Sequence, residues 1–419
     1  MTSLAIIVLC AIALFALGDL VMVCGFVWVF RKTRPAEVPA EWQPKTAVIL
    51  CLRGPDPFLD DCITALLDQD YANYGVRIIV DSRQDPAWEI AQEIVDRCPM
   101  AEVSIEELRP RRATCSLKCS SVLQAFDDLD ESYEVAALLD ADTIPHRTWL
   151  RELVAPLAQP DVGATTGNRW YLPVRPTCGS LVRHAWNAAA VVQMYFYHIP
   201  WGGTLALKLD VFRHSDLADR WAHAFCEDTM LYEVVQRRGQ RVQFVPSLMM
   251  VNRETCTLGG FYHWVRRQLL AARLYHPGWL TVAVHGILTS LAPLLALGLL
   301  LAGIAAGNAA AAWSAAAALA VSVFSSPLLL ILLERAVAQV IRRRGEPTRW
   351  LSAAGALKLF AAILLTKAVY LCALLSAIFV RAVHWRGIGY RIHGPWQIRI
   401  TDDRPYEAVP EAVAGSRSL

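Results

Sequence analysis

The sequence predicts an α/β fold, with a mostly parallel sheet covered by helices on both faces, flanked by N- and C-terminal transmembrane helices. Two observations support this prediction. Short patterns typical of buried strands alternate with helical patterns between residues 35 and about 275, as in parallel sheets built from β-α units. Long apolar runs lie before and after this region. The 419-residue chain is therefore expected to combine a globular part with membrane segments.

The composition agrees with this division. Hydrophobic residues make up 55% of the chain and charged residues 19%, whereas soluble domains contain about 45–50% and about 25%. A formal net charge of +2 gives no support for nucleic-acid binding. The 11 cysteines are scattered without a Cys-x-x-Cys pair. We therefore expect buried thiols in a reducing compartment, and neither a zinc site nor a redox site.

Residues 1–34 are predicted to contain a transmembrane helix. Apart from Asp19, residues 4–30 are apolar, and roughly 20 such residues are enough to cross a bilayer. Three basic residues follow directly, Arg31, Lys32 and Arg34. The positive-inside rule then places the N-terminus outside and the following domain in the cytoplasm. Because Asp19 is costly in lipid, we expect it to face another helix.

Residues 280–380 are predicted to hold the C-terminal membrane segments. The apolar block 280–333 is long enough for two helices and is followed by an arginine-rich loop. A further apolar stretch, about 353–380, carries two lysines and leads into a basic tail, 381–419. A simple span would place this tail outside, whereas a re-entrant or in-plane helix would return it to the cytoplasm. The sequence leaves both alternatives open.

Two predicted strands end at aspartates. The run 76–80 precedes Asp81, and the run 133–139 precedes Asp140. A further buried strand is predicted at 46–52. Ligands of parallel α/β sheets bind at the carboxyl ends of the strands. Asp81 and Asp140 are therefore expected at a ligand site.

Asp140 and Asp142 form a two-carboxylate motif directly after an apolar strand. Side chains at positions i and i+2 of an extended chain point the same way, so the two carboxylates could bind Mg²⁺ or Mn²⁺. Such an ion neutralises a bound diphosphate and makes it a better leaving group. Taken alone, the motif could equally be a solvated turn. The sequence contains neither a P-loop nor a Gly-x-Gly-x-x-Gly motif.

The motifs and their order resemble the family 2 and family 21 inverting glycosyltransferases, in particular the ceramide glucosyltransferase-like branch. Besides the N-terminal span, the resemblance rests on the segments Leu52–Pro57, Leu67–Tyr71, Ser116–Lys118, Leu139–Asp142, Trp201–Thr204, Cys226–Asp228 and Trp385–Arg391. It covers nearly the whole chain and implies the GT-A fold, with a Rossmann-like sheet, for residues 35–260. It also implies an integral membrane protein whose catalytic domain is cytoplasmic, at the bacterial inner membrane or an equivalent one.

The resemblance assigns donor-binding roles. It implies that Asp81 contacts the uridine of a UDP-sugar, that Arg53 lies near the diphosphate and that Lys118 lies near the nucleotide. Asp142 corresponds to the main metal ligand and Asp140 to a carboxylate near the ribose or the metal, so the expected cofactor is Mg²⁺ or Mn²⁺. The alternatives are a helix cap for Asp81 and solvent-exposed basic residues for Arg53 and Lys118.

Asp228 corresponds to the catalytic base of the family, with Glu227 beside it. Inversion requires that an acceptor hydroxyl attack opposite the leaving diphosphate and lose its proton. Glu227 could raise the pKa of its neighbour by like-charge repulsion, or hold its geometry. The alternative is that both residues cap a helix at 229–237. Four residues are expected on the acceptor side: Trp201, Gly202, Gly203 and Thr204.

One motif departs from the family pattern, in which Gln or Arg and two further residues precede an Arg-Trp pair. Arg267 fills the first position, but Leu270 and Ala271 stand in place of Arg-Trp. In the family the missing Arg usually contacts the diphosphate, and the missing Trp contributes to the acceptor site. Arg273 or Arg266 could substitute for the missing Arg.

The leading functional hypothesis is transfer of a hexose, glucose from UDP-glucose, to a hydroxyl of a membrane lipid such as ceramide, which would give a β-glycoside. The aromatic and basic segment 261–279 is predicted to be an interfacial amphipathic helix that sets the site at the bilayer surface; a core helix is the alternative. A processive polysaccharide synthase and a catalytically silent membrane scaffold remain as alternatives. The first would need more spans and an intact Arg-Trp pair, and the retained aspartates argue against the second.

Overall fold

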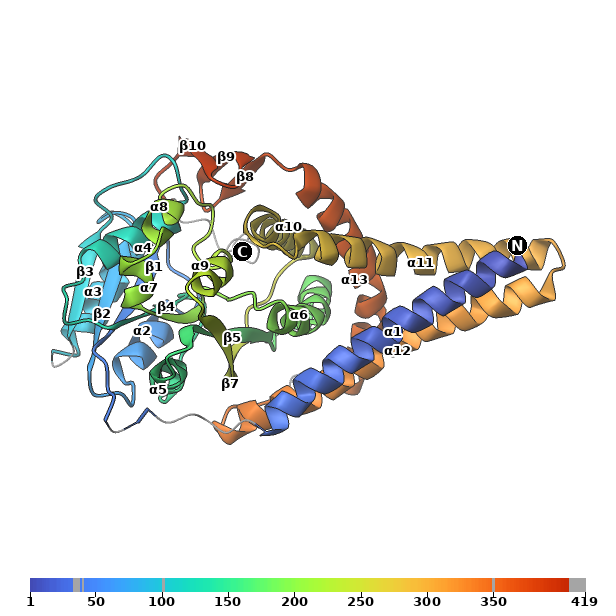
Figure 1. Cartoon of the computed structure of the whole chain (residues 1–419), viewed down its shortest axis with the longest axis horizontal. Helices are drawn as coiled ribbons and strands as arrows, with labels where there is room; N and C mark the ends of the chain where they lie inside the picture. The colour runs from blue at the N-terminus through green and yellow to red at the C-terminus, as the bar shows by residue number, and fades with distance from the viewer. Residues whose placement is uncertain (33–37, 40, 100–101, 349–350, 407–419) are drawn as a thin grey trace.

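Figure 1 shows a globular part from which long helices protrude, with the N-terminus near the far end of the protrusion. These helices are α1 (Thr2–Lys32), α11 (Trp279–Ala305) and α12 (Ala309–Arg343). The computed structural model describes residues 1–32, 38–39, 41–99, 102–348 and 351–406. Arg34 and residues 407–419 of the predicted basic tail lie outside the described residues.

A seven-stranded sheet forms the centre of the globular part, in the order β3-β2-β1-β4-β6-β5-β7. Its strands are β1 (Thr46–Leu52), β2 (Tyr74–Val80), β3 (Val103–Glu107), β4 (Val135–Leu139), β5 (Val162–Tyr171), β6 (Thr204–Lys208) and β7 (Arg241–Asn252). Neighbours pair in parallel except at β6, which is antiparallel to both β4 and β5. The prediction of a mostly parallel sheet is confirmed.

Helices enclose a hydrophobic core on each face of this sheet. In the globular part they are α2 (Leu59–Leu67), α3 (Pro86–Asp96), α4 (Leu117–Asp127), α5 (Trp149–Val154), the 3-10 turn η1 (Ala155–Ala158), α6 (Cys178–Phe196), α7 (Leu209–Arg213), α8 (Leu217–Trp221), α9 (Leu231–Arg237) and α10 (Leu258–Tyr275). Successive strand residues point to opposite faces. Ile49 therefore packs with α4 and α8, whereas its neighbour Leu50 packs with α2, α3 and α5.

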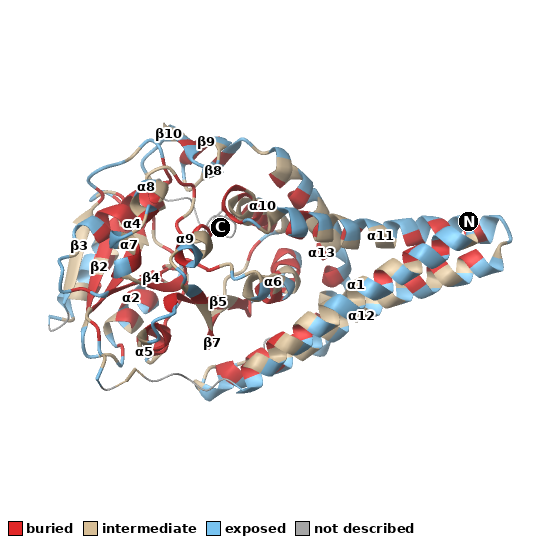
Figure 2. Cartoon of the chain, viewed as in Figure 1, coloured by how far each residue is buried: buried red, intermediate tan, exposed pale blue. Residues whose placement is uncertain are grey.

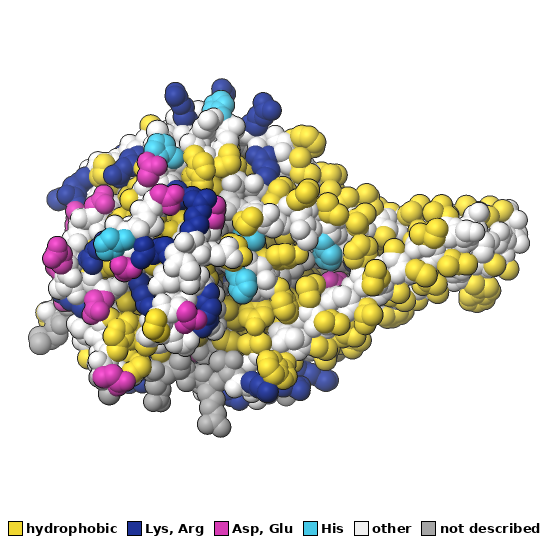
Figure 3. All heavy atoms as spheres, viewed as in Figure 1, with side chains coloured by type: hydrophobic (Ala, Val, Ile, Leu, Met, Phe, Trp, Pro, Cys, Tyr) yellow, Lys and Arg dark blue, Asp and Glu magenta, His cyan; other side chains and the backbone are white. Residues whose placement is uncertain are grey.

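Within the described part of the chain, four helices are long and apolar enough to cross a membrane: α1, α11, α12 and α13 (Ala353–Phe379). Figure 3 shows hydrophobic side chains covering the protruding helices, whereas charged side chains gather over the globular part. Figure 2 shows that much of the protruding surface is exposed, and such an apolar surface fits a lipid environment. Asp19 of α1 faces α11, as expected, with Oδ1 3.5 Å from Nε2 of His285.

Helix α13 crosses the other membrane helices at the base of the protrusion (Figure 1). Before it, Arg344 donates hydrogen bonds to the carbonyls of Ser247 and Met249 at 2.9 and 2.8 Å. After it, Arg273 donates to the carbonyl of Val380 at 3.0 Å. Both flanking segments are thus attached to the globular part. The structure therefore places the tail on the same side as the globular part, which matches the re-entrant or in-plane alternative.

The described part of the tail folds into a second, antiparallel sheet against the globular part. Its strands are β8 (Ala382–Trp385), β9 (Ile388–Gly394) and β10 (Gln397–Asp403). The β8–β9 turn consists of Arg386 and Gly387, with φ of 48° and 80°, which is the backbone conformation of a tight two-residue hairpin. This turn brings Arg386 to Arg53, whose carbonyl accepts a hydrogen bond from Arg386 Nη1 at 2.6 Å.

Candidate active site

The carboxyl ends of β1, β2 and β4 bring three predicted site residues to one edge of the sheet. Arg53, Asp81 and Asp140 directly follow these neighbouring parallel strands. Arg53 forms an ion pair with Asp81, and Arg111 pairs with Asp81 Oδ1 at 2.6 Å. Burial raises the pKa of Asp81 against the opposing effect of the two guanidinium groups. The sequence did not predict Arg111 as a site residue, because it lies in a loop without a recognisable motif.

Lys118 joins the predicted donor site to the predicted catalytic pair. It lies in the first turn of α4, where the hydroxyl of Ser116 caps the helix by accepting from the Cys119 N–H at 3.1 Å. Its ammonium lies 2.5 Å from Asp140 Oδ1 and 2.6 Å from Glu227 Oε1. Burial alone would raise the pKa of Asp140, but Lys118 holds it below its usual value. For Glu227 burial outweighs Lys118, so its pKa is raised.

Asp142 is half-buried in a carboxylate-rich environment that suits a cation. Burial, reinforced by Asp140, Asp56 and Glu254, raises the pKa of Asp142 to about 7. A divalent ion at this position would relieve the repulsion among these carboxylates. Among the described residues, no group of three or more His, Cys, Asp or Glu side chains could hold a metal by itself. Two aspartates completed by diphosphate oxygens therefore fit better, which is a common way of holding Mg²⁺.

Both carboxylate oxygens of Asp228 are oriented by hydrogen bonds. The N–H of Gly202 donates to Oδ2 at 2.9 Å, and the hydroxyl of Thr229 donates to Oδ1 at 2.9 Å. A Cβ atom at position 202 would collide with Oε1 of Glu227. A glycine is therefore required for this close approach, which fixes the orientation of the carboxylate.

The other residues predicted on the acceptor side have different positions. Trp201 is buried and lines a pocket that is also lined by Asp140, Asp142 and Asp228. A Cβ atom at Gly203 would collide with the ring of Trp201. Thr204 lies at the start of β6, where its hydroxyl accepts from Trp149 Nε1 at 3.3 Å. Thr204 is therefore part of the protein core, and it does not line the pocket.

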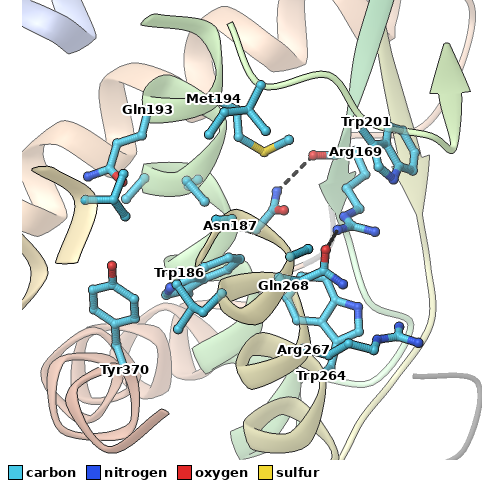
Figure 4. Close-up of a pocket in the computed structure, with 18 of the residues that line it drawn as sticks. Arg169, Trp186, Asn187, Gln193, Met194, Trp201, Trp264, Arg267, Gln268 and Tyr370 are labelled. Carbon is cyan, nitrogen blue, oxygen red and sulfur yellow. Dashed lines mark hydrogen bonds between the residues drawn. The ribbon is translucent and has the colours of Figure 1, made fainter. Parts of the chain in front are cut away.

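Helix α10 contributes Trp264 and Arg267 to the pocket (Figure 4). The guanidinium of Arg169, from β5, lies 4.6 Å from the ring centroid of Trp264 and 5.1 Å from that of Trp201. A tryptophan thus lines the pocket although the expected position, 271, holds alanine. Leu270 is buried in the core that contains α4. Trp264 could have been found from its position one turn before Arg267; the sequence offers no comparable signal for Arg169.

Arg267 is half-buried, and its buried Nη1 atom has no hydrogen-bond partner among the described residues. Its guanidinium lies 4.2 Å from the ring centroid of Trp385. Burial, together with Arg386 and Arg169, lowers the pKa of Arg267 to about 10. A guanidinium that lines a pocket and keeps an unsatisfied N–H group suits an anionic group such as a diphosphate.

Arg273, predicted to bind the donor, lies elsewhere. Its guanidinium donates to the carbonyls of Ile378 and Val380 at the end of α13, and it does not line the pocket. Carbonyl groups at the C-terminal end of a helix attract cations. The structure therefore corrects this prediction, because Arg273 caps α13. Arg266 lies over the ring of Tyr262 and does not line the pocket either.

The C-terminal sheet covers the end of the site where Arg53 and Asp81 lie. Arg386 forms an ion pair with Asp56, and Arg111 pairs with Asp403 of β10 at 2.6 Å. Arg53 Nη2 also donates to the carbonyl of Arg404 at 2.5 Å. The sequence predicted a basic tail, but only the fold shows that it completes this site.

A cavity of about 460 Å³ extends from these residues to the membrane helices. At the globular end it is lined by Asp81, Lys118, Asp140, Asp142, Asp228 and Arg267. At the other end the lining comes from α1, α11, α12 and α13, and includes Asp19, His285, Ser322 and Lys367. Polar and apolar regions thus meet in one continuous space.

A family model described as glycosyl transferase family 21 matches residues 8–397. The chain is 27% identical over 106 residues to a ceramide glucosyltransferase of Komagataella phaffii, and 22% identical over 221 residues to an uncharacterized glycosyltransferase of Haemophilus influenzae. These matches cover 25% and 49% of this chain. They span only 21% and 64% of the lengths of the two relatives.

Solved structures of similar architecture include the mannosyltransferase PcManGT of Pyrobaculum calidifontis, in complex with GDP-Man and Mn²⁺. It is 16% identical, with a TM-score of 0.48 over 90% of this chain and 99% of that chain. A glucosyl-3-phosphoglycerate synthase of Mycobacterium tuberculosis is 14% identical, with a TM-score of 0.38 over 58% of this chain and 88% of that chain.

Proposed function

Because the chain belongs to glycosyl transferase family 21 and is a glycosyltransferase, we propose that it transfers glucose from UDP-glucose to a hydroxyl of a membrane lipid, ceramide or a related lipid. Its fold class is GT-A, as the resemblance implied. The observation that carries the proposal is the cavity that runs from Asp140 and Asp142, past Asp228, to the apolar helices. A reaction between a water-soluble donor and a lipid needs such a continuous space.

We assign the donor to the strand ends. Asp81 is assigned to the uridine, with Arg53 and Arg267 near the diphosphate. The support is that Arg53 and Arg111 hold Asp81 at the edge of the sheet, and that Arg267 lines the cavity. Guanidinium groups bind phosphate oxygens through charge-assisted hydrogen bonds. The C-terminal sheet packs against the globular part. If the catalytic domain is cytoplasmic, the C-terminal sheet is therefore cytoplasmic as well.

We assign Asp142 and Asp140 to a Mg²⁺ or Mn²⁺ ion. The bound ion would neutralise the diphosphate and so make it a better leaving group. The support is that burial, reinforced by the carboxylates around Asp142, raises the pKa of Asp142 to about 7. Lys118 keeps Asp140 ionised by its ion pair at 2.5 Å.

Asp228 is assigned as the general base. The acceptor hydroxyl gives its proton to the carboxylate while its oxygen bonds to the anomeric carbon, and the diphosphate leaves with the electron pair of the broken C–O bond. Attack opposite the leaving group converts an α-linked donor into a β-glycoside. Gly202 and Thr229 hold the carboxylate through both oxygens, which favours one orientation of the hydroxyl.

The proposal is tested by incubating membranes that contain the protein with labelled UDP- and GDP-sugars, followed by lipid extraction. We expect label from UDP-glucose in a discrete lipid, and loss of that label on addition of EDTA. Label in a polymer would instead indicate a processive synthase. Absence of label from every donor would indicate a silent scaffold. Membranes lacking the protein serve as the control.

A further inference from the structure

The hairpin of β8 and β9 brings two residues from the C-terminal end of the chain, Trp385 and Arg386, to the cavity. Both line it together with Asp140, Asp142 and Arg267. Figure 1 shows this hairpin beside α10, the helix that carries Arg267. Neither residue takes part in the donor or metal assignments, although the fold places both next to the groups that do.

Two buried nitrogen atoms on neighbouring side chains lack a hydrogen-bond partner among the described residues. They are Nε1 of Trp385 and Nη1 of Arg267. The guanidinium of Arg267 lies 4.2 Å from the ring centroid of Trp385. A buried N–H group without an acceptor is unfavourable, and native proteins seldom leave one unsatisfied. Because both residues line the cavity, the oxygen atoms of a ligand there would supply the missing acceptors.

The side chain of Arg386 is held in place at the same cavity. It forms an ion pair with Asp56, and its Nη1 donates to the carbonyl of Arg53 at 2.6 Å. In return, Nε of Arg53 donates to the carbonyl of Arg386 at 2.8 Å. The side chain of Arg386 nevertheless keeps 16% of its surface accessible and lines the cavity. These contacts therefore orient the guanidinium without enclosing it.

Arg386 interacts electrostatically with groups of both signs in the cavity wall. Burial lowers the pKa of Arg267, and the positive charge of Arg386 lowers it further. Burial also opposes the charge of Arg386 itself, but the carboxylates of Asp56 and Asp142 outweigh it and raise the pKa of Arg386. An anion would relieve the repulsion between the two arginines. A diphosphate can do so while other oxygens coordinate a metal ion at Asp142.

The backbone conformation at position 386 is unusual for an arginine. The φ angle is 48° at Arg386 and 80° at Gly387, the two residues of the β8–β9 turn. Asn, Asp and Gly are preferred at such positions, because a larger side chain is strained at positive φ. Residues held in this conformation are concentrated at functional sites. The arginine is therefore better explained by what its side chain binds than by the requirements of the turn.

We propose that Trp385 and Arg386 bind the diphosphate of the donor, so that the C-terminal hairpin supplies part of the donor site. The inference rests on the proposed function, whose donor is a nucleoside diphosphate sugar. Arg386 and Arg267 donate charge-assisted hydrogen bonds to phosphate oxygens, and the indole N–H of Trp385 donates to a further oxygen. The base and the ribose make none of these contacts, so the effect is confined to ligands that carry phosphate.

The test measures UDP binding by the full-length protein in lipid nanodiscs with Mn²⁺, using titration calorimetry. Uridine, measured by displacement of UDP, is the comparison ligand because it has no phosphate. Arg386→Gln removes the charge, and Trp385→Phe removes the indole N–H but keeps a ring. Arg386→Gln/Asp56→Asn removes both members of the ion pair, so that no buried carboxylate is left unpaired. Arg391→Gln is the matched control, since Arg391 is an exposed residue of the same sheet that does not line the cavity.

We expect Arg386→Gln, alone or with Asp56→Asn, to weaken UDP binding by about tenfold, the effect of one charge-assisted hydrogen bond. Trp385→Phe should weaken UDP binding by several-fold. Uridine should bind all these variants as it binds the wild type, and Arg391→Gln should match the wild type with both ligands.

Unchanged UDP affinity in both Arg386 variants, or in Trp385→Phe, would overturn the assignment of that residue and leave the proposed function standing. An equal loss of UDP and uridine binding would show that the residue acts only on the fold, and would also overturn the assignment. If the wild type binds no UDP, the donor of the proposed function is wrong, which is a different result from a defect confined to the variants.

Discussion

The side chains at the two ends of the cavity interact with their neighbours in different ways. At the donor end, charged groups are coupled in pairs and bridges, as where Lys118 joins Asp140 to Glu227 and where Arg53 and Arg111 share Asp81. At the membrane end, polar groups form separate contacts between helices within apolar walls, as Asp19 with His285 and Lys367 with Ser322. Removing one member of a coupled, buried set leaves its partners unpaired, whereas removing an isolated contact affects that contact alone. Substitutions should therefore have large effects at the donor end and graded effects toward the membrane.

The largest expected effect is at the junction of the two ends. Asp228→Asn keeps the size of the side chain but removes the proton acceptor. We expect kcat to fall by about 10²–10⁴-fold, as for loss of a general base, with little change in the KM for UDP-glucose. The measurement is initial-rate transfer to lipid by protein in nanodiscs. A rate equal to that of the wild type would show that Asp228 is not the base.

Lys118→Met tests the coupling at the donor end directly. It leaves the buried carboxylate of Glu227 and the half-buried carboxylate of Asp140 without their shared cation; breaking a fully buried pair costs about 3–5 kcal/mol. We expect a clear fall in the thermal midpoint of unfolding in detergent. The double variant Lys118→Met/Glu227→Gln should recover part of the loss, because it removes one of the unpaired charges. An unchanged midpoint for Lys118→Met would contradict the coupling.

Two arginines of α10 form a matched pair for the next prediction. Arg267→Gln removes a guanidinium that lines the cavity, and should raise the KM for UDP-glucose by about tenfold, the effect of one charge-assisted hydrogen bond. Arg273→Gln removes the cap of α13, and should lower stability by about 1 kcal/mol while the donor KM stays unchanged. Steady-state kinetics with varied UDP-glucose separates the two. A raised KM for UDP-glucose in Arg273→Gln, with an unchanged KM in Arg267→Gln, would instead support the assignment of Arg273 to the donor site.

The smallest expected effect lies on the acceptor side of Asp228. Trp264→Leu removes the ring over which Arg169 lies at 4.6 Å, an interaction of about 0.5–1 kcal/mol. We expect the KM for the lipid acceptor to rise by several-fold, with the KM for UDP-glucose nearly unchanged. Tyr262→Leu on the same helix is the control, because Tyr262 does not line the cavity. A change in the donor KM alone would place Trp264 in the donor site.

The sequence predicted the strands that precede Arg53 and Asp81 well because strand patterns are local. The strand expected at 46–52 has those bounds, and the strand expected at 76–80 begins two residues earlier. Charged residues that follow such strands must then meet at one edge of the sheet. The bridge formed by Lys118 was not predicted, since it depends on how α4 packs against β1 and β2.

Other contacts of the site could not be located in the same way, because their residues meet only through tertiary packing. Arg386 reaches Arg53 from the other end of the chain, and Gln193 meets His285 across two helices. The path of the chain after α12 was likewise undecided, since length and hydropathy describe a spanning helix and an in-plane helix equally well. Contacts on both sides of α13 settle which side the tail occupies relative to the globular part.

The most direct test of the account is the anomeric configuration of the lipid product formed from UDP-α-glucose. The account places the lipid hydroxyl at Asp228, opposite the leaving diphosphate, and therefore predicts a single β-linked glucolipid in the organic phase. The coupling constant of the anomeric proton, measured by NMR on the purified product, distinguishes the two linkages. An α-linked product would contradict the assignment of Asp228 as the base of a direct displacement.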